Sequence, residues 1–103
     1  MTANISTGIG IYGVKVERIE KIDDREYFLH RNGPEDIDGW KVSEWESGHL
    51  VACLYDEESD PEEVLNLARE RIQKAGPDQL NQLITTAIKE WGQANAPREA
   101  VTP

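Results

Sequence analysis

The sequence predicts an α+β fold in which a four-stranded antiparallel β-meander is followed by two C-terminal α-helices. Three observations lead to this prediction. Segments that alternate apolar and polar residues occupy the first half of the chain, and two segments with helical periodicity occupy the second half. No helical segment separates the strands, so the crossover connections of a parallel sheet are missing. Neighbouring strands should therefore pair antiparallel, with the helices segregated after them.

The first two strands are predicted on either side of a turn at Asp23 and Asp24. Residues 11–19 (IYGVKVERI) place Tyr12, Val14 and Val16 on one face of a strand. Residues 26–31 (EYFLHR) are rich in aromatic side chains and form the second strand. The acidic stretch 35–38 is expected to be a connecting loop.

A β-hairpin is predicted from residues 39–45 (GWKVSEW) and 49–55 (HLVACLY). A tight loop at Ser47 and Gly48 would set one register. In that register the pairs on one face are Trp40–Tyr55, Val42–Cys53 and Glu44–Val51, and the pairs on the other face are Trp45–Leu50, Ser43–Ala52 and Lys41–Leu54. Both faces of this hairpin then carry large apolar groups, and a shift of one residue in the loop would change these pairs.

Two helices complete the predicted domain. The first begins with Asp60 as N-cap and Pro61 at the first helical position, and Gly76 with Pro77 ends it. The second begins near Asp78 and ends at Gly92. Its apolar side chains recur at helical spacing and form one stripe: Leu80, Leu83, Ile84, Ala87, Ile88 and Trp91.

The domain organisation follows from length and composition. A chain of 103 residues suits one core, which we place in residues 10–92, and we expect flexible tails at 1–9 and 93–103. The single cysteine, Cys53, excludes an intrachain disulfide. No secretory leader pattern or membrane-length apolar run occurs, so a cytoplasmic location without membrane contact is expected.

The net charge of the chain limits the kinds of molecule that it is expected to bind. Twenty Asp and Glu against 11 Lys and Arg give a formal net charge of −9. Binding to nucleic acid or to an acidic membrane depends on clustered basic side chains, so direct nucleic-acid binding is not expected. Protein partners remain, including a second copy of the chain.

Residues that could carry chemistry do not form a convincing site. His30, His49 and Cys53 lack any metal-ligand spacing, and on one strand His49 and Cys53 would stand about 13 Å apart. Ser43, Ser47, Glu44 and Glu46 gather with His49 only because a turn brings them together, and an exposed turn has no walls to exclude water. We therefore expect no metal, no cofactor and a non-catalytic role.

Two features point to an interaction surface. The acidic run 56–63 contains three carboxylates that helix capping does not explain, Asp56, Glu57 and Glu58, and they could contact a basic partner. The two-faced hairpin would leave one apolar face uncovered by the helices, nominally Trp45, Leu50, Ala52 and Leu54. Alternatively, one helix packs on each face, or the sheet curls around its own core.

The sequence therefore favours a small, acidic protein-binding module that self-associates. It would dock through one sheet face or through the acidic strand-to-helix junction, and its predicted partner-binding residues are Trp45, Leu50, Leu54, Asp56, Glu57 and Glu58. One alternative is an inhibitor that mimics nucleic acid and occupies a basic nucleic-acid-binding protein. Another is a small-molecule binder whose pocket, between sheet and helices, uses Tyr12, Tyr27, His30 and Trp40.

Overall fold

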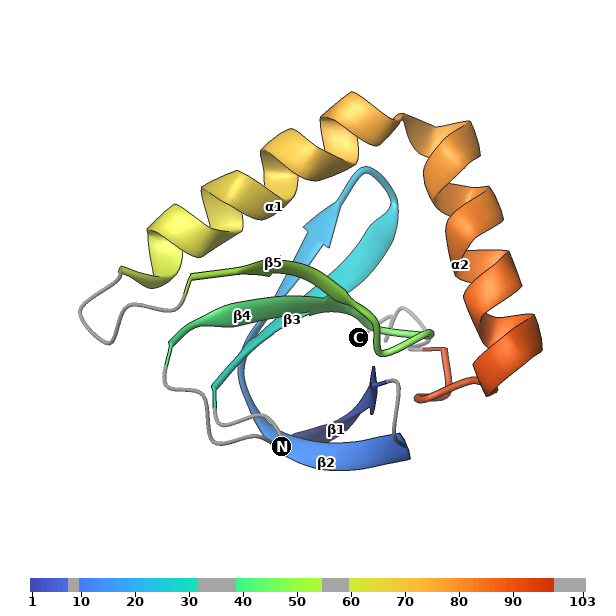
Figure 1. Ribbon diagram of the computed structural model, residues 1–103. Helices are drawn as coiled ribbons and strands as arrows, with labels where there is room; N and C mark the ends of the chain where they lie inside the picture. Colours follow the sequence, from blue (N-terminus) through green and yellow to red (C-terminus); the bar gives the residue numbers. More distant parts are fainter. Residues whose placement is uncertain (8–9, 32–38, 55–59, 98–103) are drawn as a thin grey trace, which may run out of the picture.

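A computed structural model describes residues 1–7, 10–31, 39–54 and 60–97, and these form a five-stranded sheet and two helices (Figure 1). The strands pair in chain order and are antiparallel throughout. The predicted α+β class, an antiparallel meander followed by two C-terminal helices, is confirmed, with five strands in place of four. The elements in chain order are β1 (Thr2–Thr7), β2 (Gly10–Ile22), β3 (Arg25–His30), β4 (Lys41–Glu44), β5 (Leu50–Cys53), α1 (Pro61–Ala75) and α2 (Pro77–Trp91).

The additional strand, β1, corrects the prediction that residues 1–9 form a flexible tail. Residues 2–7 pair with the first half of the long strand β2, whose second half pairs with β3. Ala3 and Ile5 are buried against Val14, so the segment does have the alternation of a half-buried strand. That signal is short and lies among small polar residues, which is why the sequence pattern concealed it.

The sheet curls strongly, and this divides the interior into two cores (Figure 1). Between α1 and the sheet lies the outer core, made of Ile22, Tyr27, Leu29, Val42, Ala52, Val64, Leu65, Ala68 and Ile72. On the other face, within the curl, lies the inner core, made of Ala3, Ile5, Val14, Phe28 and Trp45. The rings of Phe28 and Trp45 meet edge to face, with centroids 5.5 Å apart. Both faces of the central strands are thus covered within one molecule.

Residues 94–96, which we call the C-terminal clasp, close the curl along β1. The Asn95 side chain accepts a hydrogen bond from the Asn4 amide (2.8 Å) and donates to the Asn4 carbonyl (2.8 Å) and the Trp45 carbonyl (2.7 Å). The indole of Trp45 donates to the carbonyl of Ala96 (2.7 Å). The expected C-terminal tail is therefore corrected as well, because the clasp within residues 93–97 is hydrogen-bonded to the sheet; residues 98–103 lie outside the described part of the chain.

The β4–β5 hairpin is present, but its predicted register is wrong. The strand pairs are Lys41–Cys53, Val42–Ala52 and Ser43–Leu50, with an irregularity after Val42. The reason is a longer loop, residues 45–48, which the Glu44 amide closes by donating to the His49 carbonyl (2.9 Å). The buried Glu44 carboxylate stabilises this loop by accepting from the amides of Glu46 (2.7 Å) and Ser47 (2.9 Å).

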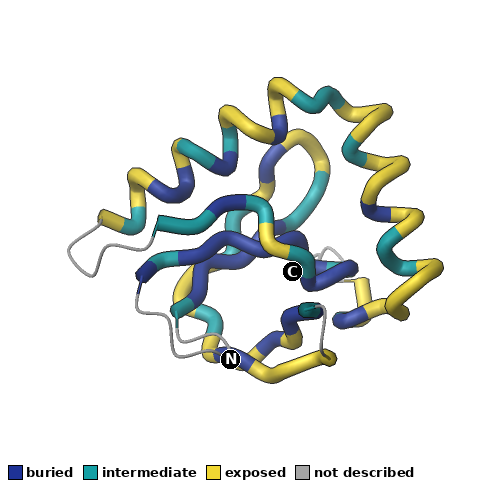
Figure 2. Tube along the Cα trace, viewed as in Figure 1, coloured by how far each residue is buried: buried dark blue, intermediate teal, exposed yellow. Residues whose placement is uncertain are grey.

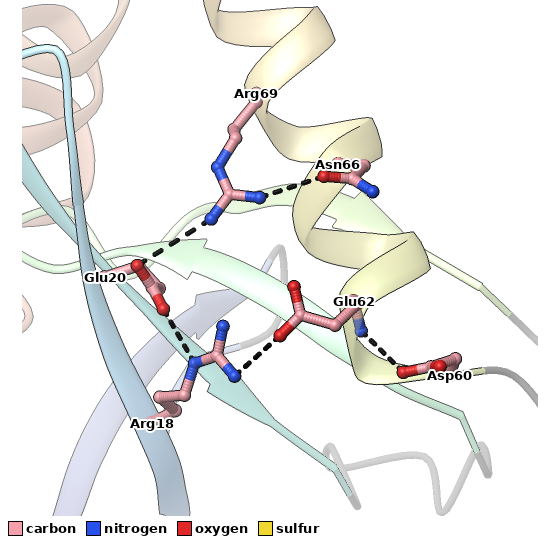
Figure 3. A network of polar contacts seen from close by, with 6 residues as sticks. All are labelled: Arg18, Glu20, Asp60, Glu62, Asn66 and Arg69. Atoms are coloured by element: carbon pink, nitrogen blue, oxygen red, sulfur yellow. Dashed lines mark hydrogen bonds and ion pairs between the residues drawn. The ribbon is translucent and has the colours of Figure 1, made fainter.

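Helix α1 begins as predicted, and exposed ion pairs join it to β2. The Asp60 carboxylate accepts a hydrogen bond from the Glu62 amide (2.9 Å), as an N-cap should. Arg18 of β2 joins Glu62 (2.8 Å) to Glu20 (2.7 Å), and Arg69 of α1 approaches Glu20 at 3.8 Å (Figure 3). Such exposed pairs contribute little individually, so the outer core carries most of the attachment of α1.

Candidate interaction surface

Helix α2 leaves two large members of its apolar stripe, Leu83 and Trp91, exposed to solvent. Ile84 is its only fully buried residue, whereas the side of α1 that faces the sheet is buried along its length (Figure 2). Leu83 is 56% exposed and Trp91 is 52% exposed. Two large apolar side chains exposed on one helix make it a candidate interaction surface.

A groove separates α2 from the edge strand β5. It has a volume of about 350 Å³, and Leu50, which is 52% exposed, contributes to its wall. The residues that line it are Glu44, Ser47, His49, Leu50, Val51, Arg71, Ile72, Ala75, Leu80, Leu83, Ile84 and Ala87. A second hollow shares His49, Leu83 and Ala87 with this groove and extends to Trp91. We call the resulting continuous area, with Leu50, Leu83, Ala87 and Trp91 as its apolar members, the α2–β5 surface.

The α2–β5 surface is nearly uncharged. Among the residues that line the two hollows, the only Asp, Glu, Lys or Arg residues are Glu44, Arg71 and Glu90. The Glu44 carboxylate is already bonded to loop amides, and Arg71 donates to the Val51 carbonyl at 2.9 Å. A chain with a net charge of −9 therefore keeps most of its charge away from this area. Depletion of charge is the compositional mark of an interface centre.

Both edges of the sheet are partly occupied by other parts of the molecule. Arg71 fills a hydrogen-bonding position on β5 by binding the Val51 carbonyl, and Asn95 fills both backbone groups of Asn4 on β1. An incoming strand would have to displace these contacts before it could extend the sheet. Docking on the helical side of the groove requires no such displacement.

The structure separates the three apolar residues predicted to bind a partner. Trp45 is buried in the inner core, and Leu54 packs against the outer core as a partly buried residue. Only Leu50 is exposed. The premise that one hairpin face lacks cover therefore fails at Trp45, because the curled sheet and the clasp cover it. The acidic residues Asp56, Glu57 and Glu58 lie outside the residues that the structure describes.

Leu83, Ala87 and Trp91 were missed by sequence reasoning as surface residues. They belong to the stripe that the helical pattern assigns to a core, and a pattern of spacing does not reveal what covers it. The available signal was the four-residue spacing of Leu83, Ala87 and Trp91, which places them in one row along the helix.

The aromatic and histidine residues proposed for a small-molecule pocket do not converge. Tyr27 belongs to the outer core, and His30 is buried on the opposite face of β3. Tyr12 is partly exposed on β2, while Trp40 lies beneath the guanidinium of Arg31 at 4.7 Å. Each of the four therefore has a separate environment.

Burial shifts the pKa of two of these groups. Burial raises the pKa of Tyr27 to about 12, with the Glu44 carboxylate adding to the effect. Burial, together with a smaller effect of the positive charge of Lys41, lowers the pKa of His30 to about 4. The His30 Nε2 lies 2.8 Å from the Ser43 hydroxyl, while within the described residues its Nδ1 has no hydrogen-bond partner. His30 is thus held neutral in the inner part of the sheet.

The remaining groups that could carry chemistry are the carboxylates and Cys53. An open hollow of about 600 Å³ is lined by six acidic residues, together with Lys21 and Arg25: Asp23, Asp24, Glu26, Glu44, Glu46 and Asp78. In the portion of the chain that the structure describes, no three His, Cys, Asp or Glu side chains are grouped so that they could hold a metal ion. Cys53 is partly buried and unpaired with another cysteine. In the same portion, neither helix has the length and apolar character needed to cross a membrane.

Comparison with known proteins finds no family model, no curated protein and no solved structure that matches this chain.

Proposed function

We propose that this protein is a non-catalytic protein-binding module that self-associates, and that it docks through the α2–β5 surface. One observation carries the proposal: Leu50, Leu83 and Trp91 are each about half exposed, and they border adjoining hollows that are nearly free of charge. Aromatic and aliphatic side chains at the uncharged centre of a patch are what stable interfaces use.

Charge restricts where a second copy of the chain could dock. Two molecules of net charge −9 repel each other, so a stable contact between them has to form where acidic residues are sparse. The α2–β5 surface meets that requirement. A basic protein, by contrast, would gain most of its attraction from the carboxylates, and few of these border this surface.

The salt dependence should be diagnostic of this arrangement. Added salt screens the repulsion between two acidic copies while leaving apolar contacts in place, so self-association should strengthen as salt is raised. Docking of a basic protein on the acidic junction at Asp56, Glu57 and Glu58 remains the alternative mode, and it should weaken under the same conditions.

Sedimentation equilibrium of the purified chain tests the proposal. The wild type should form a dimer, whereas Leu83→Glu and Leu50→Glu should be monomers, because each buries a carboxylate in the apolar contact. Thr85→Glu is the matched control, since Thr85 is exposed and lies on the opposite face of α2 from Ala87. It should dimerise like the wild type, and circular dichroism should show that all four proteins are folded.

A wild-type chain that stays monomeric up to about 1 mM, where a dissociation constant corresponds to only about 4 kcal/mol, would overturn the proposal. Dimerisation of Leu83→Glu with unchanged affinity would also overturn it.

The nucleic-acid mimic is less well supported. Such a mimic needs free carboxylates along one surface, yet Glu20 and Glu62 are paired with arginines and Glu44 is buried in its loop. The acidic hollow near Asp23 and Asp78 also contains Lys21 and Arg25, which lower its negative field.

A further inference from the structure

We infer that α2 and the C-terminal clasp form one movable unit, residues 77–96, which opens away from the sheet while α1 and the sheet stay folded. We call this unit the α2 arm. In Figure 1 it runs from the end of α1 along one side of the molecule, and the clasp then returns to β1. The inference concerns a single chain, so it does not depend on self-association.

The helix of the α2 arm has a glycine at each end. Gly76 lies between the two helices and Gly92 lies between α2 and the clasp, with φ angles of 81° and 89°. Among the described residues, no heavy atom beyond the adjacent residues comes within 4 Å of the place where a β-carbon of either glycine would stand. Moving elements usually turn about a few such terminal positions, whose backbone angles can change without disturbing neighbouring side chains. The two glycines therefore provide the joints that an opening of α2 requires.

Between these joints α2 contacts the rest of the fold through few side chains. Ile84 is its one buried residue, Leu80 packs against the outer core, and Arg25 of β3 donates a hydrogen bond to Asn81. Open hollows lie on both sides of this contact. The groove of about 350 Å³ separates α2 from β5, and the polar hollow of about 600 Å³ lies between the start of α2 and the β2–β3 turn. Detaching α2 therefore exposes little apolar area that the fold now buries.

The clasp provides most of the hydrogen bonds that hold the arm, and it binds both β1 and the β4–β5 loop. The Asn95 side chain is bonded to both backbone groups of Asn4 and to the Trp45 carbonyl. The carbonyl of Ala94 accepts a hydrogen bond from the Asn4 side chain (3.1 Å). Ala94 is also buried against Gly48, where an added β-carbon would lie 2.7 Å from that of Ala94. The far end of the arm is thus closely fitted to the sheet, whereas the helix itself is not.

Release of the clasp would detach α2 as well, because only Gly92 and Gln93 separate them. An isolated helix of 15 residues is marginal in water, so a detached α2 would lose its backbone hydrogen bonds. The same step would uncover the Trp45 indole, which now donates to the Ala96 carbonyl, and the outer edge of β1 at Asn4. The α2 arm therefore controls access to that edge and to Trp45.

Native-state hydrogen exchange of the wild-type chain, at a concentration where it is monomeric, tests the inference. The α2 amides, the Trp45 indole N–H and the Asn4 amide should exchange through one opening, with equal protection and an equal dependence on urea. The amides of α1 and β3 should be more protected by about tenfold or more, because they stay closed in that opening.

A variant of the clasp provides the second test. Asn95→Ala removes three hydrogen bonds between the clasp and the sheet. It should speed exchange at the α2 amides and at the Trp45 indole by the same factor, about tenfold or more, while α1 keeps its wild-type exchange. Asn66→Ala is the matched control, because Asn66 is exposed on α1 and bonded to Arg69 of the same helix. It should leave exchange in α2 unchanged.

The wild-type measurement can overturn the inference by itself, even if Asn95→Ala does not fold. Equal protection of α1 and α2 would show that the two helices open together. A Trp45 indole that stays protected while α2 exchanges would show that the clasp holds without the helix. In the folded variant, faster exchange at Trp45 with unchanged exchange in α2 would likewise overturn it.

Discussion

Helices α1 and α2 have similar sequence patterns, but the fold buries them to different extents. Each has 15 residues, begins with a proline and ends at a glycine with positive φ, Gly76 (81°) or Gly92 (89°). Yet α1 buries four residues, Val64, Leu65, Ala68 and Ile72, and α2 buries only Ile84. The fold therefore buries most of the apolar side of α1, whereas in α2 it leaves the large side chains of Leu83 and Trp91 about half exposed.

Helix α1 is also attached to the sheet more firmly than α2. α1 has a side-chain N-cap and lies across the outer core, where Leu65 and Ile72 contact the sheet residues of that cluster. α2 has no side-chain cap, and its link to the sheet turn is a hydrogen bond from Arg25 to the Asn81 side chain, together with Leu80 packed against the outer core. Because α2 is attached to its own chain by few contacts, it has apolar area left for another molecule.

The largest expected effect comes from shortening a leucine in each helix. Leu65 is completely buried, so Leu65→Ala should reduce the free energy of unfolding by about 2–5 kcal/mol through lost burial and a cavity. Leu83 is 56% exposed, so Leu83→Ala should change the stability of the monomer by less than about 0.5 kcal/mol. Urea denaturation at a low protein concentration, where the chain is monomeric, measures both.

High protein concentration should reveal an effect of Leu83→Ala on stability that is absent in the monomer. Leu83→Ala would then lose the stabilisation that dimerisation gives the wild type, and its midpoint should fall below the wild-type value. Equal stability losses for Leu65→Ala and Leu83→Ala at low concentration would contradict the distinction between the two helices.

The sequence predicted the two helices better than it predicted their surroundings. Asp60, Pro61 and the terminal glycines are local signals that act through hydrogen bonds and backbone angles of nearby residues, and the structure confirms that α1 starts at Pro61 and that Gly92 ends α2. The stripe of α2 was correctly predicted as helical. Whether a stripe is covered depends on contacts with distant parts of the chain, and spacing alone does not contain that information.

The errors in the sheet have the same origin. The register of the β4–β5 hairpin depends on the Glu44 carboxylate, which holds a longer loop than the glycine pattern indicates. Trp45 was expected on an uncovered face because the pattern treats a sheet as flat. The curl that encloses it depends on β1 and on Asn95, which lies 50 residues further along the chain.

The second largest expected effect is a loss of stability at low pH that His30 causes and His49 does not. His30 lies within the sheet, and His49 lies beside the α2 groove. His30 has its pKa lowered to about 4 by burial, against about 6.5 in the unfolded chain. Between these values the unfolded chain binds a proton that the folded chain does not, so stability should fall as pH drops from about 6.5 to 4. The loss should reach about 3 kcal/mol at most. Above pH 6.5 both states are neutral at His30, and the full contribution is retained.

Urea denaturation across this pH range measures the slope, and two variants assign it. His30→Gln removes the titrating group and should flatten the slope, even if the variant is less stable at pH 7. His49→Gln is the matched control, because His49 is only partly buried at the groove, and it should leave most of the slope in place. A slope that persists in His30→Gln would show that carboxylates, and not His30, cause the acid sensitivity.

The smallest effect concerns the first turn of each helix. The Asp60 carboxylate caps α1 by accepting from the Glu62 amide, so Asp60→Ala should cost about 1 kcal/mol. Asp78 stands in the first turn of α2 without a capping hydrogen bond, so Asp78→Ala should cost only the interaction with the helix dipole, a few tenths of a kcal/mol. Thermal unfolding of the two variants beside the wild type compares them.

If α2 is the less firmly attached helix, Asp78→Ala should also increase hydrogen exchange in α2 while α1 keeps its protection. Equal exchange in both helices would mean that they unfold as one unit. Helix α2 would then be as rigid as the core of the domain.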